Sequence, residues 1–112
     1  MARDKKTFGY IISEARKEVG LSQKQLAALI RKENNEPISP QYLNDIEHDR
    51  RNPPSEFIVK QLATQLNLDK DYLLFVSGSL PEDIRKIGLD RPETVEQAFS
   101  VFRRAKKGGE VR

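Results

Sequence analysis

Apolar residues recur at intervals of three and four along five short stretches of this 112-residue chain, and each stretch opens with a residue that favours helix starts. This periodicity predicts helices over residues 7–19, 22–32, 40–48 and 55–66, and a fifth that begins at residue 69. No stretch alternates long enough to predict a sheet. Helices this short cannot each bury an apolar stripe alone, so we expect them to pack as one small bundle. The sequence therefore predicts an all-α fold.

Several of these predicted helices begin at a recognisable cap. Ser22 is followed three residues later by Gln25, which is the pattern of a capping box. Ser39 precedes Pro40, whose missing N–H costs nothing in the first turn of a helix. Two further N-caps are predicted, at Ser55 and Asp69.

The turn-rich string SGSLP interrupts the helical pattern after the fifth helix. We therefore divide the chain into a helical bundle over residues 1–77 and a short helical extension over residues 78–112. Two helices are expected in the extension, from Pro81 to about Ile87 and from Pro92 to about Arg104.

The last predicted helix carries an apolar stripe formed by Val95, Phe99 and Phe102. The stripe either covers the bundle or meets the same stripe of a second copy. Two Phe side chains leave more apolar area than so small a domain needs, and such area often marks an interface. We favour a homodimer.

Composition excludes several classes of protein. There is no Cys, which excludes disulfides, thiolate catalysis and zinc-finger scaffolds. No run approaches the roughly 18 apolar residues of a membrane span, and the first residues lack the pattern of a signal peptide, so we expect a cytoplasmic protein. The net charge of +3 leans only weakly towards an anionic partner, so nucleic-acid binding would depend on local arrangement.

Enzymatic and metal-binding motifs are not apparent. His48 is the single histidine, and its neighbours Glu47 and Asp49 would point in other directions on a helix. The chain has no Gly-rich phosphate loop, nucleophile elbow or paired carboxylates. We therefore expect no enzyme activity, no cofactor and no metal.

The third predicted helix is short and mostly polar, which suits a helix that enters a DNA major groove. Gln41 and Asn44 carry amides that can bond adenine twice, and Tyr42 can contact a thymine methyl or a phosphate. Asp45 can accept a hydrogen bond from cytosine, although it would also repel phosphate. The alternative is an ordinary polar surface helix, since such residues are common on surfaces.

Cations and amides next to this helix suit contacts to the DNA backbone. Arg50, Arg51 and Asn52 follow it, where a duplex backbone would pass. Gln23 and Lys24 lie at the start of the second helix, where N–H groups and the helix dipole favour a phosphate. A solvated, charged turn is the alternative for the arginine loop.

Three strings, in this order, resemble the Cro and lambda-repressor-like regulators of the xenobiotic-response-element (XRE) type: RKEVGLSQKQLA, SPQYLNDIEHDRRNPP and LATQLNLDKDYLL. The resemblance covers about Phe8 to Val76. It implies a five-helix DNA-binding domain that is usually dimeric on double-stranded DNA with two half-sites.

The resemblance also assigns residues by position. Gln23 matches the glutamine that anchors the second helix to a phosphate, and we count Ser39 among the phosphate contacts as well. Arg16 and Glu47 match a pair that forms a structural salt bridge between the first and third helices. The base-reading positions of such proteins fall on residues already named: Gln41, Asn44 and Asp45.

Two features depart from the family pattern. A loop of roughly six extra residues without Gly, RKENNEPI, stands where members have a tight turn, so the second helix runs longer or the loop itself touches DNA through Arg31 and Lys32. Pro40 stands where some members have a base-reading glutamine, and proline cannot make that contact.

These patterns together favour a sequence-specific transcriptional regulator, a repressor rather than an activator, that acts as a dimer on a palindromic operator. The extension leaves no room for a large ligand-sensing domain, so a releasing signal would come through a partner protein. The alternative is a protein-interaction module, such as an antitoxin or adaptor, that reuses the same fold.

Overall fold

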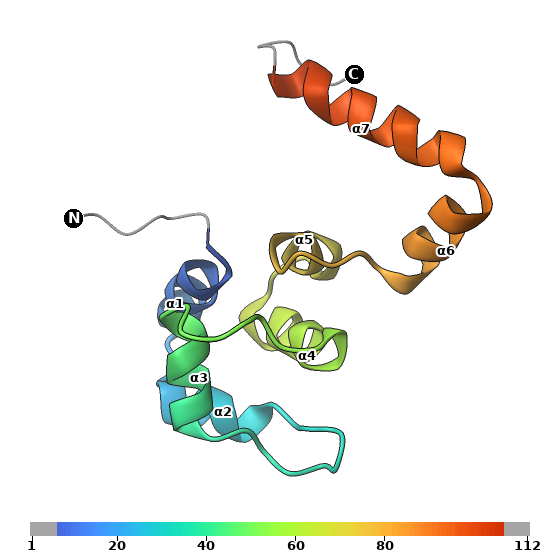
Figure 1. The fold of residues 1–112 in the computed structure, drawn as a ribbon. Coiled ribbons are helices and arrows are strands. Elements are labelled where there is room, and N and C mark those ends of the chain that lie inside the picture. The colour runs from blue at the N-terminus through green and yellow to red at the C-terminus, as the bar shows by residue number, and fades with distance from the viewer. Residues whose placement is uncertain (1–6, 107–112) are drawn as a thin grey trace. The chain divides into compact units, whose positions relative to one another are not determined.

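The computed structural model describes residues 7–106, and all regular elements in that range are α-helices (Figure 1). The prediction of an all-α fold is therefore confirmed. The chain divides into two compact units, with the boundary between Ser79 and Leu80. The helices of the first unit are α1 Phe8–Val19, α2 Gln23–Leu29, α3 Pro40–Glu47, α4 Glu56–Leu66 and α5 Lys70–Val76, and those of the second are α6 Glu82–Asp90 and α7 Pro92–Lys106.

All five helices of the first unit contribute to one hydrophobic core, as their apolar spacing predicts. Val19, in the last turn of α1 before the left-handed Gly20, lies outside this core and is 42 % exposed. The core side chains are Phe8, Ile12, Ala15, Leu26, Ala27, Ile30, Ile38, Leu43, Ile46, Ile58, Val59, Leu62, Ala63, Leu66, Leu73 and Leu74.

Side-chain caps start most of these helices. Ser22 and Gln25 form the predicted capping box, and the Ser39 hydroxyl accepts from the Tyr42 N–H at 3.0 Å. Asp69 caps α5 as predicted, by accepting from the Tyr72 N–H. The prediction for Ser55 is wrong in part: it occupies the N-cap position of α4 but makes no side-chain cap bond. Ser55 is exposed, so water can serve the first N–H groups there instead.

The segment between α2 and α3 is a small hairpin and not a continuation of α2. The second helix ends at Leu29, short of the predicted end near Lys32, and Arg31 and Pro37 form an antiparallel bridge. The Lys32 N–H donates to the Glu36 carbonyl, and the Asn35 N–H donates to the Lys32 carbonyl, each at 2.8 Å. Asn35 has a φ of 69°, the left-handed conformation that a three-residue hairpin loop needs and that Asn tolerates better than most residues.

A glutamine of α4 holds the root of this hairpin. The Gln61 amide oxygen accepts from the Arg31 N–H at 2.7 Å, and its nitrogen donates to the Arg31 carbonyl at 2.8 Å. Ile30 and Ile38 flank the hairpin and are both buried in the core. Gln61 therefore pairs with the backbone of Arg31 much as a neighbouring strand would.

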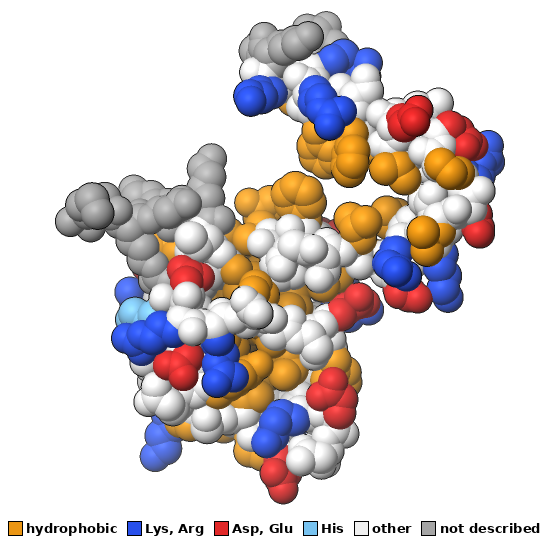
Figure 2. Space-filling model, viewed as in Figure 1, with side chains coloured by type: hydrophobic (Ala, Val, Ile, Leu, Met, Phe, Trp, Pro, Cys, Tyr) orange, Lys and Arg blue, Asp and Glu red, His pale blue; other side chains and the backbone are white. Residues whose placement is uncertain are grey.

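The second unit contains α6 and α7, and neither helix has a buried residue. Both helices run past their predicted ends, α6 to Asp90 and α7 to Lys106. Hydrophobic side chains gather along both helices (Figure 2). No helix within residues 7–106 is both long and apolar enough to cross a bilayer.

Candidate nucleic-acid interface

A close contact between α1 and the end of α3 fixes the position of α3. The Gly9 N–H donates to Asp49 Oδ1 at 2.9 Å, and a Cβ at Gly9 would come within 2.7 Å of the Glu47 carbonyl. Asp49 has a φ of 57°, which turns the chain sharply after α3. Sequence reasoning missed this contact, because nothing local marks Gly9 and Asp49 as partners.

The second link between α1 and α3 is a buried ion pair. Arg16 Nε lies 2.7 Å from Glu47 Oε2, and Arg16 Nη2 donates to Glu47 Oε1 at 3.0 Å. A third donor of Arg16, Nη1, bonds the Leu21 carbonyl at 2.9 Å. Glu47 is 1 % exposed, so this bidentate pair lies in the interior, between the two residues that the family resemblance paired.

Gln23 joins α2 to the same cluster. Its Nε2 donates to Glu47 Oε1 at 2.9 Å and to Asn44 Oδ1 at 3.1 Å. Both protons of that nitrogen are thereby used inside the protein, so a phosphate contact at Gln23 would fall to its backbone N–H. Side chains of α1, α2 and α3 thus meet in one cluster, and this cluster sets the orientation of α3.

The polar face of α3 carries Gln41 in an exposed position, while Tyr42, Asn44 and Asp45 are half-buried. Gln41 Nε2 donates to Asp45 Oδ1 at 3.0 Å. The Asn44 amide oxygen is the one that accepts from Gln23, which leaves its nitrogen as a donor. The structure therefore leaves Gln41 exposed and turns Asn44 partly towards α2.

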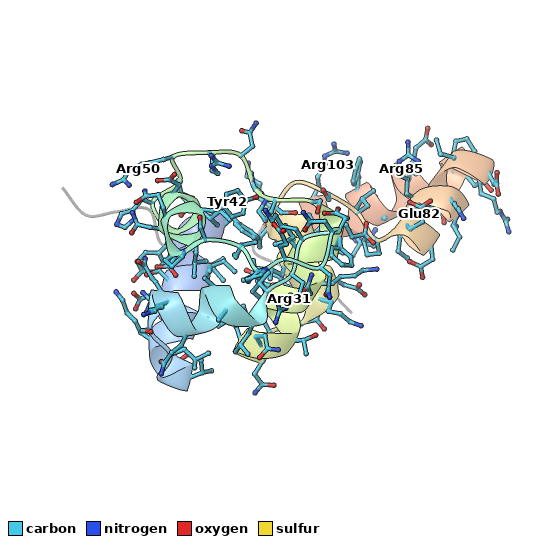
Figure 3. The ribbon with its side chains drawn as sticks, turned by 90° about the horizontal axis from the view of Figure 1, so that it is seen from below. Arg31, Tyr42, Arg50, Glu82, Arg85 and Arg103 are labelled. Carbon is cyan, nitrogen blue, oxygen red and sulfur yellow. The ribbon has the colours of Figure 1, made fainter. Side chains whose placement is uncertain are left out.

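Both arginines of the loop after α3 lie against side chains of the helix. Arg50 Nη1 is 3.4 Å from Asp45 Oδ1, and the Arg51 guanidinium stacks 4.6 Å from the centre of the Tyr42 ring. Figure 3 shows Tyr42 and Arg50 beside α3, with Arg31 apart from them. Lys24 and Asn52 are exposed, whereas the hydroxyl of exposed Ser39 is engaged in capping α3.

A hollow lies between the hairpin and the start of α3. It has a volume of about 490 Å³ and is lined by hairpin residues such as Lys32 and Pro37, by Tyr42, and by Ser55 at the start of α4. On this side Figure 2 shows Lys and Arg side chains interspersed with Asp and Glu, so the basic groups are local and not a continuous field. No group of three or more His, Cys, Asp or Glu side chains in the described part of the chain could hold a metal ion.

Comparison with known proteins identifies the family. Neither the curated proteins nor the solved structures contain a significant match. A family model described as helix-turn-helix matches residues 12–73, which is more than half of the chain and runs from α1 into α5. The match confirms the resemblance that the three sequence strings carry. The chain belongs to the XRE-type helix-turn-helix family of DNA-binding transcription regulators.

Proposed function

We propose that the protein is a sequence-specific transcriptional repressor that binds a palindromic operator as a homodimer. The observation that carries this proposal is the exposed amide of Gln41 on α3, a helix fixed by buried contacts to α1 and α2. A rigid helix with an outward amide suits base reading, because an amide can accept from adenine N6 and donate to N7 at once.

Base reading in this proposal centres on Gln41, with Tyr42, Asn44 and Asp45 completing the face of α3. The Asn44 amide oxygen accepts from Gln23, so its nitrogen is the donor that Asn44 can offer to a base. Phosphate contacts come from the flanking groups, which fix the register of the helix in the groove without reading sequence. These groups are the side chains of Lys24, Arg50, Arg51 and Asn52 and the helix starts at Gln23 and Ser39.

The homodimer in this proposal forms through the stripe of α7. Val95, Phe99 and Phe102 are 38 %, 50 % and 59 % exposed, and α6 adds exposed Ile84 and Ile87. A second copy is the occupant we propose, because a two-fold interface presents the same apolar stripe from both partners. Such a dimer would set two α3 helices about 34–36 Å apart in successive major grooves and block a promoter sterically.

Selection of bound sequences from random duplex DNA tests the function. We expect palindromic output whose half-sites are centred about one helical turn apart, with binding that falls steeply as salt rises. Output without any enriched sequence, together with salt-independent capture of a partner protein, would instead favour an adaptor or antitoxin that reuses the fold.

A further inference from the structure

We propose that Asp45 is a positioning residue that dictates which atoms Gln41 presents to the groove, and so which base it reads. The inference rests on the proposed base-reading function and deepens it. Asp45 and Gln41 lie one turn apart on α3, and Asp45 Oδ1 accepts from Gln41 Nε2 at 3.0 Å. The same oxygen lies 3.4 Å from Arg50 Nη1.

The chemistry of the carboxylate fixes the orientation of the amide. An ionised carboxylate only accepts hydrogen bonds, so the Gln41 nitrogen must face it and the Gln41 oxygen must face away. A flipped amide would direct its oxygen at the carboxylate and lose the bond. Gln41 therefore presents one acceptor and one remaining N–H donor outward, in a single arrangement that matches the N6 and N7 edge of adenine.

Arg50 offsets the negative charge by which Asp45 would otherwise repel DNA. Its guanidinium lies beside the Asp45 carboxylate, and its backbone N–H also donates to the Asp45 carbonyl at 2.9 Å. The pair is close to neutral, and a guanidinium has five N–H donors, so Arg50 can also reach a phosphate. Asp45 thus links the base-reading amide to the backbone-contacting arginine.

Replacing Asp45 by its neutral isostere should lower the discrimination between base pairs without lowering the affinity for non-specific duplex. In Asp45→Asn the new side chain can offer either an oxygen or a nitrogen, so Gln41 is free to flip and its discrimination at one base pair should fall by about tenfold. The same change removes a negative charge at the interface, so affinity for non-specific duplex should stay equal or rise. If Asp45 only supported the fold, the same change would lower discrimination and non-specific affinity together.

A double-mutant comparison separates positioning from direct reading. Random-duplex selection and affinity measurements are made on the full chain, on Asp45→Asn, on Gln41→Ala and on the variant with both changes. If Asp45 acts through Gln41, adding Asp45→Asn to Gln41→Ala should cause no further loss of preference. A change of preference at a different base pair, or one that persists without Gln41, would overturn the proposal. Glu33→Gln, which removes an exposed carboxylate from the hairpin, is the matched charge control.

A measurement without DNA keeps this inference distinct from the proposed function. In the nuclear magnetic resonance spectrum of the free protein, the Gln41 side-chain amide signals should move in Asp45→Asn. The side-chain amide of Gln65, on α4, should not move. An unmoved Gln41 signal would overturn the positioning role whatever DNA the protein binds. A moved signal, combined with no enriched sequence from the wild-type selection, would instead count against base reading and leave the contact itself supported.

Discussion

Glu47 does more to fix the position of α3 than any exposed residue, because its carboxylate accepts hydrogen bonds from side chains of two other helices. Arg16 of α1 and Gln23 of α2 both donate to its carboxylate. Within the described residues, every buried side-chain nitrogen and oxygen has a hydrogen-bond partner. A buried charge is tolerated only when its bonds are made, so the cluster holds the three helices in one arrangement.

Removing the Glu47 carboxylate should therefore be costly. We expect Glu47→Ala to lower the free energy of unfolding by about 3 kcal/mol, since it leaves the Arg16 charge largely buried without its partner. Urea unfolding followed by circular dichroism measures the loss. Glu14→Ala removes one member of the exposed Lys17–Glu14 pair and should cost about 0.5 kcal/mol or less. Equal costs for the two variants would contradict a structural role for the buried pair.

The exposed residues of the interface should behave in a different way from Glu47, and differently from one another. Gln41→Ala should cost about 1–3 kcal/mol of discrimination at one base pair and leave non-specific affinity nearly unchanged. Arg51→Ala should weaken binding to all duplexes alike and reduce the salt slope by about one. Titrations against preferred and scrambled duplexes at several salt concentrations distinguish the effect of Gln41→Ala from that of Arg51→Ala. If Gln41→Ala left affinity and preference intact, Gln41 would not read bases.

The sequence predicted which residue types form the site, but not which partner each side chain contacts. The resemblance paired Arg16 with Glu47, and the structure places them in contact. It also assigned Gln23 to a phosphate, yet the Gln23 amide nitrogen faces Asn44 and Glu47. Nor could the sequence show that Asp45 holds Gln41, because which way an amide turns depends on partners brought close by the fold.

At the scale of the helix, periodicity and caps were enough to predict α1 to α5. They failed at the end of α2, where Ile30 and the residues after it continue a helical pattern while the backbone enters the hairpin. The features that fix this hairpin are the left-handed Asn35 and the contact that Gln61 makes with Arg31, thirty residues earlier in the chain. A long-range contact of this kind leaves no mark in the local sequence.

Gln61 should determine how firmly the hairpin is held. We expect Gln61→Ala to lower the free energy of unfolding by about 1–2 kcal/mol, because the Arg31 N–H and carbonyl both lose a partner. Hydrogen exchange of the Arg31 amide should accelerate by more than the global loss explains, since the root of the hairpin opens locally. Gln65→Ala, on exposed surface of the same helix, is the matched control. Unchanged exchange at Arg31 would show that Ile30 and Ile38 alone hold the hairpin.

The two units differ in how they bury apolar surface. The first has a core drawn from five helices, whereas the second has no buried residue in α6 or α7. A helix pair with an uncovered apolar stripe lacks the burial that offsets the entropy of folding. This exposed apolar stripe is the physical basis for proposing that a second copy covers it.

A single charge on the α7 stripe should disrupt the dimer without destabilising the first unit. We expect Phe99→Asp to convert the protein from dimer to monomer in analytical ultracentrifugation, because a carboxylate on the stripe cannot be buried against its own copy. Thermal unfolding of the first unit should change little, since its core contains no residue of α7. Affinity for a complete palindrome should fall to that for one half-site, because the two α3 helices are no longer linked.

Gln97→Asp adds the same charge about half a turn away from Phe99 and should leave the dimer intact, because residues two apart lie on different faces of a helix. A Phe99→Asp protein that stays dimeric would place the subunit contact elsewhere. If the first unit then melted at a lower temperature, the stripe of α7 would be a cover for the bundle, and the spacing of two half-sites would have to be set by a different surface.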